Sequence, residues 1–266
     1  MSLIKPTEPS RAGAIAALGY ALACYAGFVL VFLYAVGFLA NAVVPLSVDH
    51  GGPSAPYAVA VLVDALLLGI FAVQHSAMAR PAFKERWTRL VPRHVERSTY
   101  VLLSSMALAL VCRQWRPIPQ VVWEVSWPPA RVAIWGVCAG GWLWALAMTY
   151  AIDHVGLFGL RQVTRHLRGL EETDPAFVVP WPYRLVRHPM MVGFAVAFVA
   201  TPRMTVGHLL FAVLGIAYIC AGVRLEERDL SAALPEYDAY AATTPSLVPR
   251  PMSRPESRPA SRSGRR

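Results

Sequence analysis

Polar and apolar residues follow one another along this chain in long blocks, without the short period of an amphipathic surface helix or strand. Six apolar blocks hold a single formal charge, that of Asp64: residues 14–40, 57–79, 98–112, 132–152, 190–201 and 204–223. A helix needs about 20 apolar residues to cross a bilayer, whose hydrocarbon core excludes charge. The pattern predicts an all-α fold, a polytopic integral membrane protein with five to six transmembrane helices.

The fifth block leaves the number of spans open. Residues 190–201 rise only about 18 Å as a helix, and the sequence Thr201-Pro202-Arg203-Met204 then turns the chain. A short hairpin that is lined by protein and reaches part of the way across is one interpretation, and a full span is the other. Under either interpretation the sixth block ends on the side of the membrane that carries most of the Lys and Arg residues.

The basic residues predict the orientation of the helices. Of the 25 Lys and Arg residues, all but Arg113, Arg116, Arg131 and Arg203 fall on one side of the six-block arrangement. Cytoplasmic loops carry such an excess, so we expect both the N-terminus and the C-terminus in the cytoplasm. The net charge of +9 therefore requires no nucleic-acid partner.

Composition narrows the class of protein further. Charged residues make up 15% of the chain, against about 25% in soluble domains. The four cysteines are isolated in apolar blocks, so we expect no metal site. No G-x-G-x-x-G motif occurs, which excludes a soluble Rossmann domain.

The tail, residues 250–266, is basic and poor in apolar residues, and we expect it to be disordered against anionic lipid headgroups.

Ionisable residues at the ends of the apolar blocks are candidates for chemistry. Asp64 and His75 lie eleven residues apart in one block, which places them on the same helix face. Charged or titratable groups inside a membrane are functional candidates by default. The alternative is that His75 bonds a loop carbonyl and Asp64 a neighbouring helix.

Two further clusters lie at predicted helix ends on the cytoplasmic side. Pro189 suits a first helical position, and the unpaired N–H groups there, beside Arg187 and His188, form an anion site. Glu226 and Glu227 lie at a helix C-terminus, where the dipole disfavours negative charge, so we expect a cation nearby. Topology-setting charge at a membrane boundary is the alternative interpretation of the first cluster.

These clusters carry a family resemblance over residues 183–249. Arg187-His188-Pro189 with Gly193, then Glu226-Glu227, Tyr237-x-x-Tyr240 and Pro249, resembles the isoprenylcysteine carboxyl methyltransferase-like superfamily of membrane enzymes. The stretches 74–76, 96–100, 157–162 and 202–208 look like those of methanethiol S-methyltransferases and the neighbouring NnrU-like proteins. One departure is Pro235, where the family usually has Gly.

The resemblance implies S-adenosylmethionine as methyl donor and a small thiol, methanethiol, as acceptor, with dimethyl sulfide as product. The implied donor-binding residues are Tyr183, Arg187, His188, Pro189, Gly193, Glu226 and Glu227. The donor's carboxylate suits the helix start at Pro189, and its ammonium and ribose hydroxyls suit Glu226 or Glu227. The chain then divides into four spans in 1–152, a methyltransferase-like region with a helical hairpin in 153–249, and the tail.

The implied reaction is in-line methyl transfer to a thiolate. An alkyl thiol is mostly protonated at neutral pH, so a base or a nearby positive charge is needed. His188, His75 and Arg161 are the candidates. We expect a bacterial inner-membrane enzyme with its site facing the cytoplasm, with the thiol and membrane lipid as partners and no obligatory protein partner.

Two other functions remain open: the first shares Arg187, His188, Glu226 and Glu227, and the second shares the helices and some loop motifs. A carboxyl methyltransferase acting on an isoprenylcysteine-type substrate would differ in the groove that admits the acceptor. A non-enzymatic NnrU-like membrane protein would not bind S-adenosylmethionine.

Overall fold

The fold is a bundle of long helices, described by a computed structural model over residues 11–170 and 178–249. The predicted disordered tail, 250–266, lies outside the described residues. Five helices of the described part are long and apolar enough to span a membrane: α1 (Arg11–Ala40), α2 (Tyr57–Ala79), α4 (Arg93–Gln114), α5 (Pro128–Ile152) and α9 (Val206–Ala233). The prediction of a polytopic helical membrane protein is confirmed.

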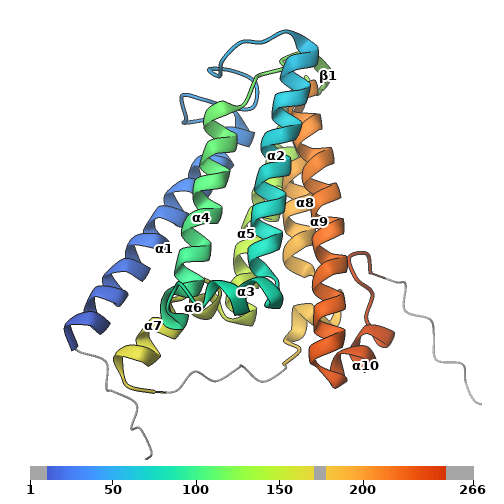
Figure 1. Cartoon of the computed structure of the whole chain (residues 1–266). Coiled ribbons are helices and arrows are strands. Elements are labelled where there is room, and N and C mark those ends of the chain that lie inside the picture. The colour runs from blue at the N-terminus through green and yellow to red at the C-terminus, as the bar shows by residue number, and fades with distance from the viewer. Residues whose placement is uncertain (1–10, 171–177, 250–266) are drawn as a thin grey trace, which may run out of the picture.

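The short elements gather at the two ends of the bundle (Figure 1). One end, here called the α10 end, carries α3 (Pro81–Trp87), α6 (His154–Leu157), α7 (Leu160–Leu167), the 3-10 helix η1 (Trp181–Arg184) and α10 (Pro235–Thr243). The other end, the β end, carries the antiparallel strands β1 (Val121–Glu124) and β2 (Arg203–Thr205). The all-α prediction did not include this small strand pair. Helix α1 begins at the α10 end, so the described N-terminal and C-terminal helices start and finish at the same end.

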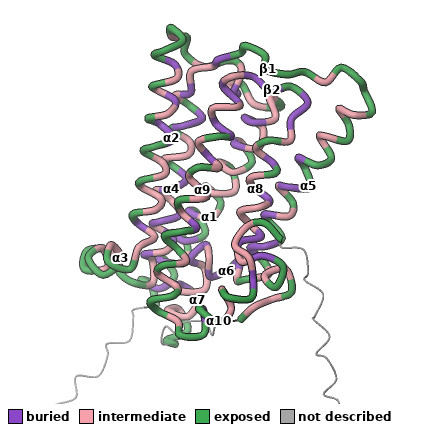
Figure 2. Tube along the Cα trace, turned by 90° about the vertical axis from the view of Figure 1, so that its right-hand side faces the viewer, coloured by how far each residue is buried: buried purple, intermediate pink, exposed green. Residues whose placement is uncertain are grey.

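The surface of the bundle is apolar along the length of the helices. Leu30, Leu62 and Val73 expose about 70% of their area, and Figure 2 shows exposed positions recurring along α2 and α5. Large contiguous apolar surface is unfavourable in water, and in a bilayer it faces lipid. This distribution supports a membrane position for the long helices.

The uncertain fifth block traverses the bundle although its helix is short. Helix α8 (Pro189–Val199) has 11 residues and rises about 17 Å. The chain then leaves the helix at Ala200 and continues without helical structure to β2, where Thr205 pairs with Val121 of β1 at the β end. The passage is therefore completed by a short helix and a non-helical segment, and α9 returns from the β end to the α10 end.

Backbone groups in the last turn of α8 and in the non-helical segment after it find partners inside the bundle. His208 Nε2 lies 2.9 Å from the carbonyl oxygen of Phe198 in α8, and Trp123 Nε1 donates to the carbonyl of Thr201 at 3.3 Å. The carbonyl of Pro202 accepts from Val125 N at 2.8 Å. Non-helical backbone at membrane depth requires such protein partners because lipid supplies none. Groups of neighbouring elements thus satisfy the backbone carbonyls where the helix ends and the chain continues without helical structure.

Helix α8 is held against α5 by two glycines. A Cβ on Gly141 would lie 2.8 Å from the carbonyl oxygen of Gly193, and a Cβ on Gly193 would lie 2.7 Å from that of Gly141. Small residues let helix backbones approach this closely in membranes. The pair positions the start of α8, and with it His188, relative to the end of α5.

Asp64 belongs to the packing of the β end. Its side chain is fully buried, and Oδ1 accepts a hydrogen bond from the backbone N–H of Arg116 at 2.8 Å. Nearby, Trp115 Nε1 donates to the carbonyl of Val48 at 3.1 Å, and Thr205 bonds Asp49. Asp64 therefore connects α2 to the segment after α4, far from the α10 end.

Candidate active site

The start of α8 is tied to the segment that follows α10. The backbone N–H of Arg187 donates to the carbonyl of Pro245 at 2.9 Å, and that of His188 to the carbonyl of Ser246 at 3.1 Å. Pro189 at the first helical position has no N–H to satisfy, which favours a helix beginning there. The chain after α10 thus folds back to hold the two residues before α8.

Glu227 is the centre of a hydrogen-bond cluster at this point. Its Oε1 accepts from Arg187 Nε at 2.9 Å, Arg187 Nη2 at 2.7 Å, His188 Nε2 at 3.0 Å and Ser246 Oγ at 2.8 Å. Arg187 Nη1 also donates to the carbonyls of Ala241 and Thr244. The prediction that the two glutamates lie at a helix C-terminus is wrong, because α9 continues to Ala233. The cation beside Glu227 is Arg187.

The neighbouring glutamate has a different environment. Glu226 exposes 47% of its side chain, and its Oε2 lies 3.7 Å from His188 Nδ1. Because a carboxylate only accepts, the bond to Glu227 assigns the proton of a neutral His188 to Nε2 and leaves Nδ1 as an acceptor. His188, only 7% exposed, therefore points one nitrogen at the Glu227 cluster and the other toward Glu226.

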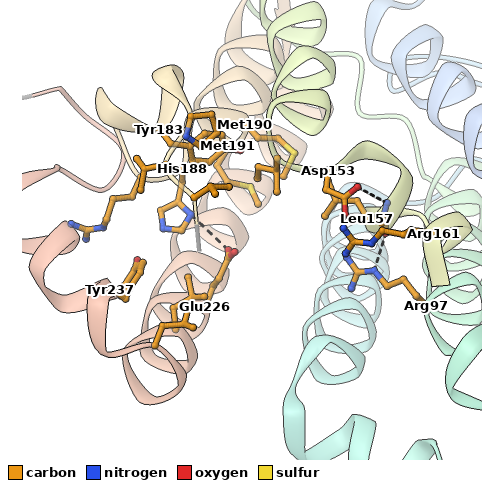
Figure 3. A pocket seen from close by; sticks show the side chains of 18 of the residues that line it. Arg97, Asp153, Leu157, Arg161, Tyr183, His188, Met190, Met191, Glu226 and Tyr237 are labelled. Carbon is orange, nitrogen blue, oxygen red and sulfur yellow. Dashed lines mark hydrogen bonds and ion pairs between the residues drawn. The ribbon is translucent and has the colours of Figure 1, made fainter. Parts of the chain in front are cut away.

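A cavity of about 620 Å³ opens at the α10 end, and its lining comes from both halves of the chain. That volume is typical of a small-molecule site. The C-terminal wall is formed by Val178, Val179, Pro180, Tyr183, Arg187, His188, Met190, Met191, Glu226, Leu230, Leu234, Tyr237 and Tyr240. The N-terminal wall is formed by Lys84, Thr88, Arg93, Glu96, Arg97, Ile152, Asp153, Gly156, Leu157, Arg161 and Gln162. Figure 3 shows His188, Glu226 and Tyr237 facing Asp153, Arg161 and Arg97 across the cavity.

The tyrosines give the C-terminal wall an aromatic surface. Tyr240 OH donates to the carbonyl of Tyr183 at 2.6 Å, and the rings of Tyr237 and Tyr240 meet edge to face at 5.9 Å. The two residues lie three apart in α10, which places them on one helix face. Burial, with the charge of Glu227, raises the pKa of Tyr237 to about 12, so the phenol stays neutral. The wall offers flat apolar surface with neutral hydroxyl groups.

The N-terminal wall is rich in charge. Arg161 forms an ion pair with Asp153, and Arg97 Nε donates to the carbonyl of Leu157 at 2.8 Å. Burial and the nearby Arg97 guanidinium lower the pKa of Lys84, an effect that Glu96 partly offsets. Positive charges on this wall therefore lie close enough to repel one another.

The predicted site residues separate into two groups. Tyr183, Arg187, His188, Glu226 and Arg161 line the cavity. His75, Pro189, Gly193 and Glu227 are not among its lining residues.

The second group has other contacts. His75 Nε2 lies 2.9 Å from Tyr100 OH, and its ring stacks on Phe71. The carbonyl of Pro189 accepts from Trp144 Nε1 at 3.0 Å.

Within the described residues, no group of three or more His, Cys, Asp and Glu side chains could hold a metal ion.

Sequence reasoning assigned no role to several residues of the N-terminal wall, among them Lys84, Glu96 and Gln162. Glu96 and Gln162 do lie in stretches that carry the family resemblance, and that was the available signal. Their meeting at one cavity depends on the folding of α4, α6 and α7 against one another, which no local pattern reveals.

Comparison with known proteins gives consistent relatives. No family model and no solved structure match the chain. It is 51% identical to Methanethiol S-methyltransferase of Mycobacterium tuberculosis, over 87% of this chain and 95% of the relative. It is 51% identical to Methanethiol S-methyltransferase 2 of Bradyrhizobium diazoefficiens, over 89% and 91%. Methanethiol S-methyltransferase of a Pseudomonas strain is 46% identical, over 90% and 92%. This level of identity over nearly the whole of each relative shows that the chain belongs to the methanethiol S-methyltransferase family.

Proposed function

We propose that this chain methylates methanethiol to dimethyl sulfide with S-adenosylmethionine as donor, by in-line transfer at a membrane-embedded site. The observation that carries the proposal is the cavity between the two walls, into which His188 and Glu226 project from the family motif. The donor supplies an electrophilic methyl group on a sulfonium. Residues of the chain must bind the donor, position the two substrates and accept the thiol proton.

The C-terminal wall suits the nucleoside part of the donor. Tyr183, Tyr237 and Tyr240 offer aromatic faces for an adenine ring, and Glu226 has an exposed carboxylate for ribose hydroxyls. Glu227 is the weaker candidate for direct contact because its Oε1 already accepts four hydrogen bonds. We assign Glu227 and Arg187 to positioning His188 and the start of α8.

His188 is the proposed proton acceptor. Its Nδ1 accepts the thiol proton, and Glu227 holds the ring and stabilises the imidazolium that forms, as a carboxylate does in a catalytic triad. The thiolate sulfur forms a bond to the methyl carbon while the bond from that carbon to the donor sulfur breaks. The electron pair returns to the departing S-adenosylhomocysteine. Arg161 lies across the cavity, and His75 lies outside its lining, so we favour His188 of the three candidates.

The position of the cavity agrees with the expected orientation. It lies at the α10 end, whose helices α3, α7 and η1 and the segments beside them, with the nearby ends of α4 and α9, carry most of the basic residues of the described ranges, so the proposal places it on the cytoplasmic side of a bacterial inner membrane. Met190, Met191, Ile152 and Leu157 provide an apolar part of the lining, which suits a small apolar thiol that partitions into the bilayer.

The test is a headspace assay for dimethyl sulfide. Membranes from a host that expresses the chain receive S-adenosylmethionine and methanethiol. We expect product from the wild type and from Glu85→Ala, an exposed residue outside the cavity lining, and none from His188→Ala or Glu226→Ala. Donor binding without dimethyl sulfide would favour another acceptor, such as an isoprenylcysteine-type carboxylate. Absence of donor binding would contradict the enzyme assignment and favour a non-enzymatic membrane protein.

A further inference from the structure

The N-terminal wall contains a buried acidic side chain, one oxygen of which has no hydrogen-bond partner among the described residues. Glu96, in the first turn of α4, exposes only 8% of its area and lines the cavity. Its Oε1 is fully buried and makes no hydrogen bond with the described residues. A buried carboxylate without a partner is costly, and a ligand that donates to it or carries positive charge removes that cost.

Cations without partners lie on the same wall. Neither Lys84 nor Arg93 has an ion-pair partner within 4 Å among the described residues, and both line the cavity. Arg161 differs because Asp153 already pairs with it. Unsatisfied groups of both signs therefore face one space, which matches a ligand that carries both an ammonium and a carboxylate.

The alternative anion site at the start of α8 is partly used. The backbone N–H groups of Met191 and Val192 both donate to the carbonyl of His188, at 3.1 and 3.2 Å. The guanidinium of Arg187 is engaged by Glu227 and by two carbonyl groups. These bonds leave the first turn of α8 fewer donors for a carboxylate than a free helix start has.

We propose that the N-terminal wall binds the amino-acid part of the methyl donor, with Glu96 holding its ammonium and Lys84 and Arg93 its carboxylate. This inference rests on the proposed function and adds to it. The donor then lies across the cavity, with its nucleoside on the C-terminal wall and its sulfonium between the walls. Lys84, Arg93 and Glu96 become specificity residues that select S-adenosylmethionine over adenosine derivatives without the amino acid.

The first experiment compares two ligands on the full chain in detergent by calorimetry: S-adenosylhomocysteine and 5′-methylthioadenosine, which lacks the amino-acid part. We expect Glu96→Gln to weaken S-adenosylhomocysteine about tenfold or more, and to change 5′-methylthioadenosine less than twofold. Glu85→Gln, an exposed glutamate outside the cavity lining, is the matched control and should change neither.

The second experiment separates the carboxylate from the ammonium. Lys84→Met should weaken S-adenosylhomocysteine several-fold and leave its decarboxylated counterpart unchanged. This comparison still tests whether the N-terminal wall binds the amino-acid part of the donor if Glu96→Gln does not give a folded protein.

The outcomes are distinguishable. Equal weakening of S-adenosylhomocysteine and 5′-methylthioadenosine in Glu96→Gln, or of S-adenosylhomocysteine and its decarboxylated form in Lys84→Met, would overturn the assignment of the N-terminal wall. So would wild-type affinities in both variants. A wild type that binds neither S-adenosylhomocysteine nor 5′-methylthioadenosine would instead overturn the proposed function, and this inference with it.

Discussion

The two sides of the cavity differ in how far their buried carboxylates are satisfied by the protein itself. Behind the C-terminal wall, one oxygen of Glu227 accepts four hydrogen bonds, and Arg187 bonds two carbonyls in addition. On the N-terminal wall, one buried oxygen of Glu96 has no hydrogen-bond partner among the described residues. Buried polar atoms without partners are not confined to that wall, because the phenol oxygen of Tyr183 on the C-terminal wall also has none in the described part of the chain. A carboxylate that the protein already bonds is held in place, while a buried carboxylate oxygen without a partner can bind a ligand. The two sides therefore differ in the hydrogen bonds of their carboxylates.

The same contrast separates the adjacent glutamates of α9. Glu227 lies inside the cluster, and Glu226 faces the cavity with 47% of its side chain exposed. Neighbours on a helix point about 100° apart, so one can serve the fold while the other serves a ligand.

The largest effect should come from Glu227→Ala. It removes the acceptor of Arg187 and His188 together, and we expect a loss of about 2–4 kcal/mol of stability and of all methyl transfer. The thermal midpoint in detergent and the dimethyl sulfide assay measure the two losses. Glu226→Ala is the matched control and should keep the wild-type midpoint. Equal midpoints for the two variants would show that the contrast between the glutamates is wrong.

Gly141→Ala tests the contact that sets the distance between the walls. The added Cβ meets backbone atoms, Gly193 O at 2.8 Å and Ala197 N at 2.9 Å, which cannot move aside as a side chain can. We expect a loss of about 1–3 kcal/mol and lower activity. Gly140→Ala in the same helix has nothing within 4 Å of its Cβ and should be neutral or slightly stabilising. Similar melting of the two variants would contradict the proposed role of the α5–α8 contact.

Glu226→Gln should change donor binding without changing the fold. Its carboxylate is half exposed, and its Oε2 lies 3.7 Å from His188 Nδ1. We expect KM for S-adenosylmethionine to rise about tenfold with an unchanged thermal midpoint. Steady-state kinetics at saturating methanethiol measure the effect. An unchanged KM would remove Glu226 from the donor site.

The smallest effect is expected for Tyr240→Phe. The substitution removes the hydrogen bond from the phenol to the carbonyl of Tyr183, at 2.6 Å, and keeps the aromatic face. We expect about 0.5–1.5 kcal/mol of destabilisation and at most a several-fold loss of activity. Thermal melting with Tyr57→Phe as control, an exposed tyrosine of α2 far from the cavity lining, checks the result. A loss as large as that of Glu227→Ala would mean that the tyrosine does more than join η1 to α10.

The sequence determined the membrane class and the long helices. Charge-free blocks of 20 or more residues can be stable in a bilayer only as spanning helices, so the spans in α1 and α5 follow from composition alone. It also determined where chemistry could occur, because Arg187, His188, Glu226 and Glu227 lie at block ends in a family motif. These are local properties, and each depends on residues close together in the chain.

Only the tertiary structure decided what those residues do. That a short helix and a non-helical segment together complete the passage depends on partners such as His208 and Trp123, which come from other elements. That Glu227 accepts four hydrogen bonds depends on residues 19 to 40 positions away in the chain, and that one oxygen of Glu96 has no partner among the described residues depends on the packing around it. Hydrogen bonds and burial act over a few ångströms in space regardless of separation along the chain, and the spacing of residues in a sequence does not contain that information.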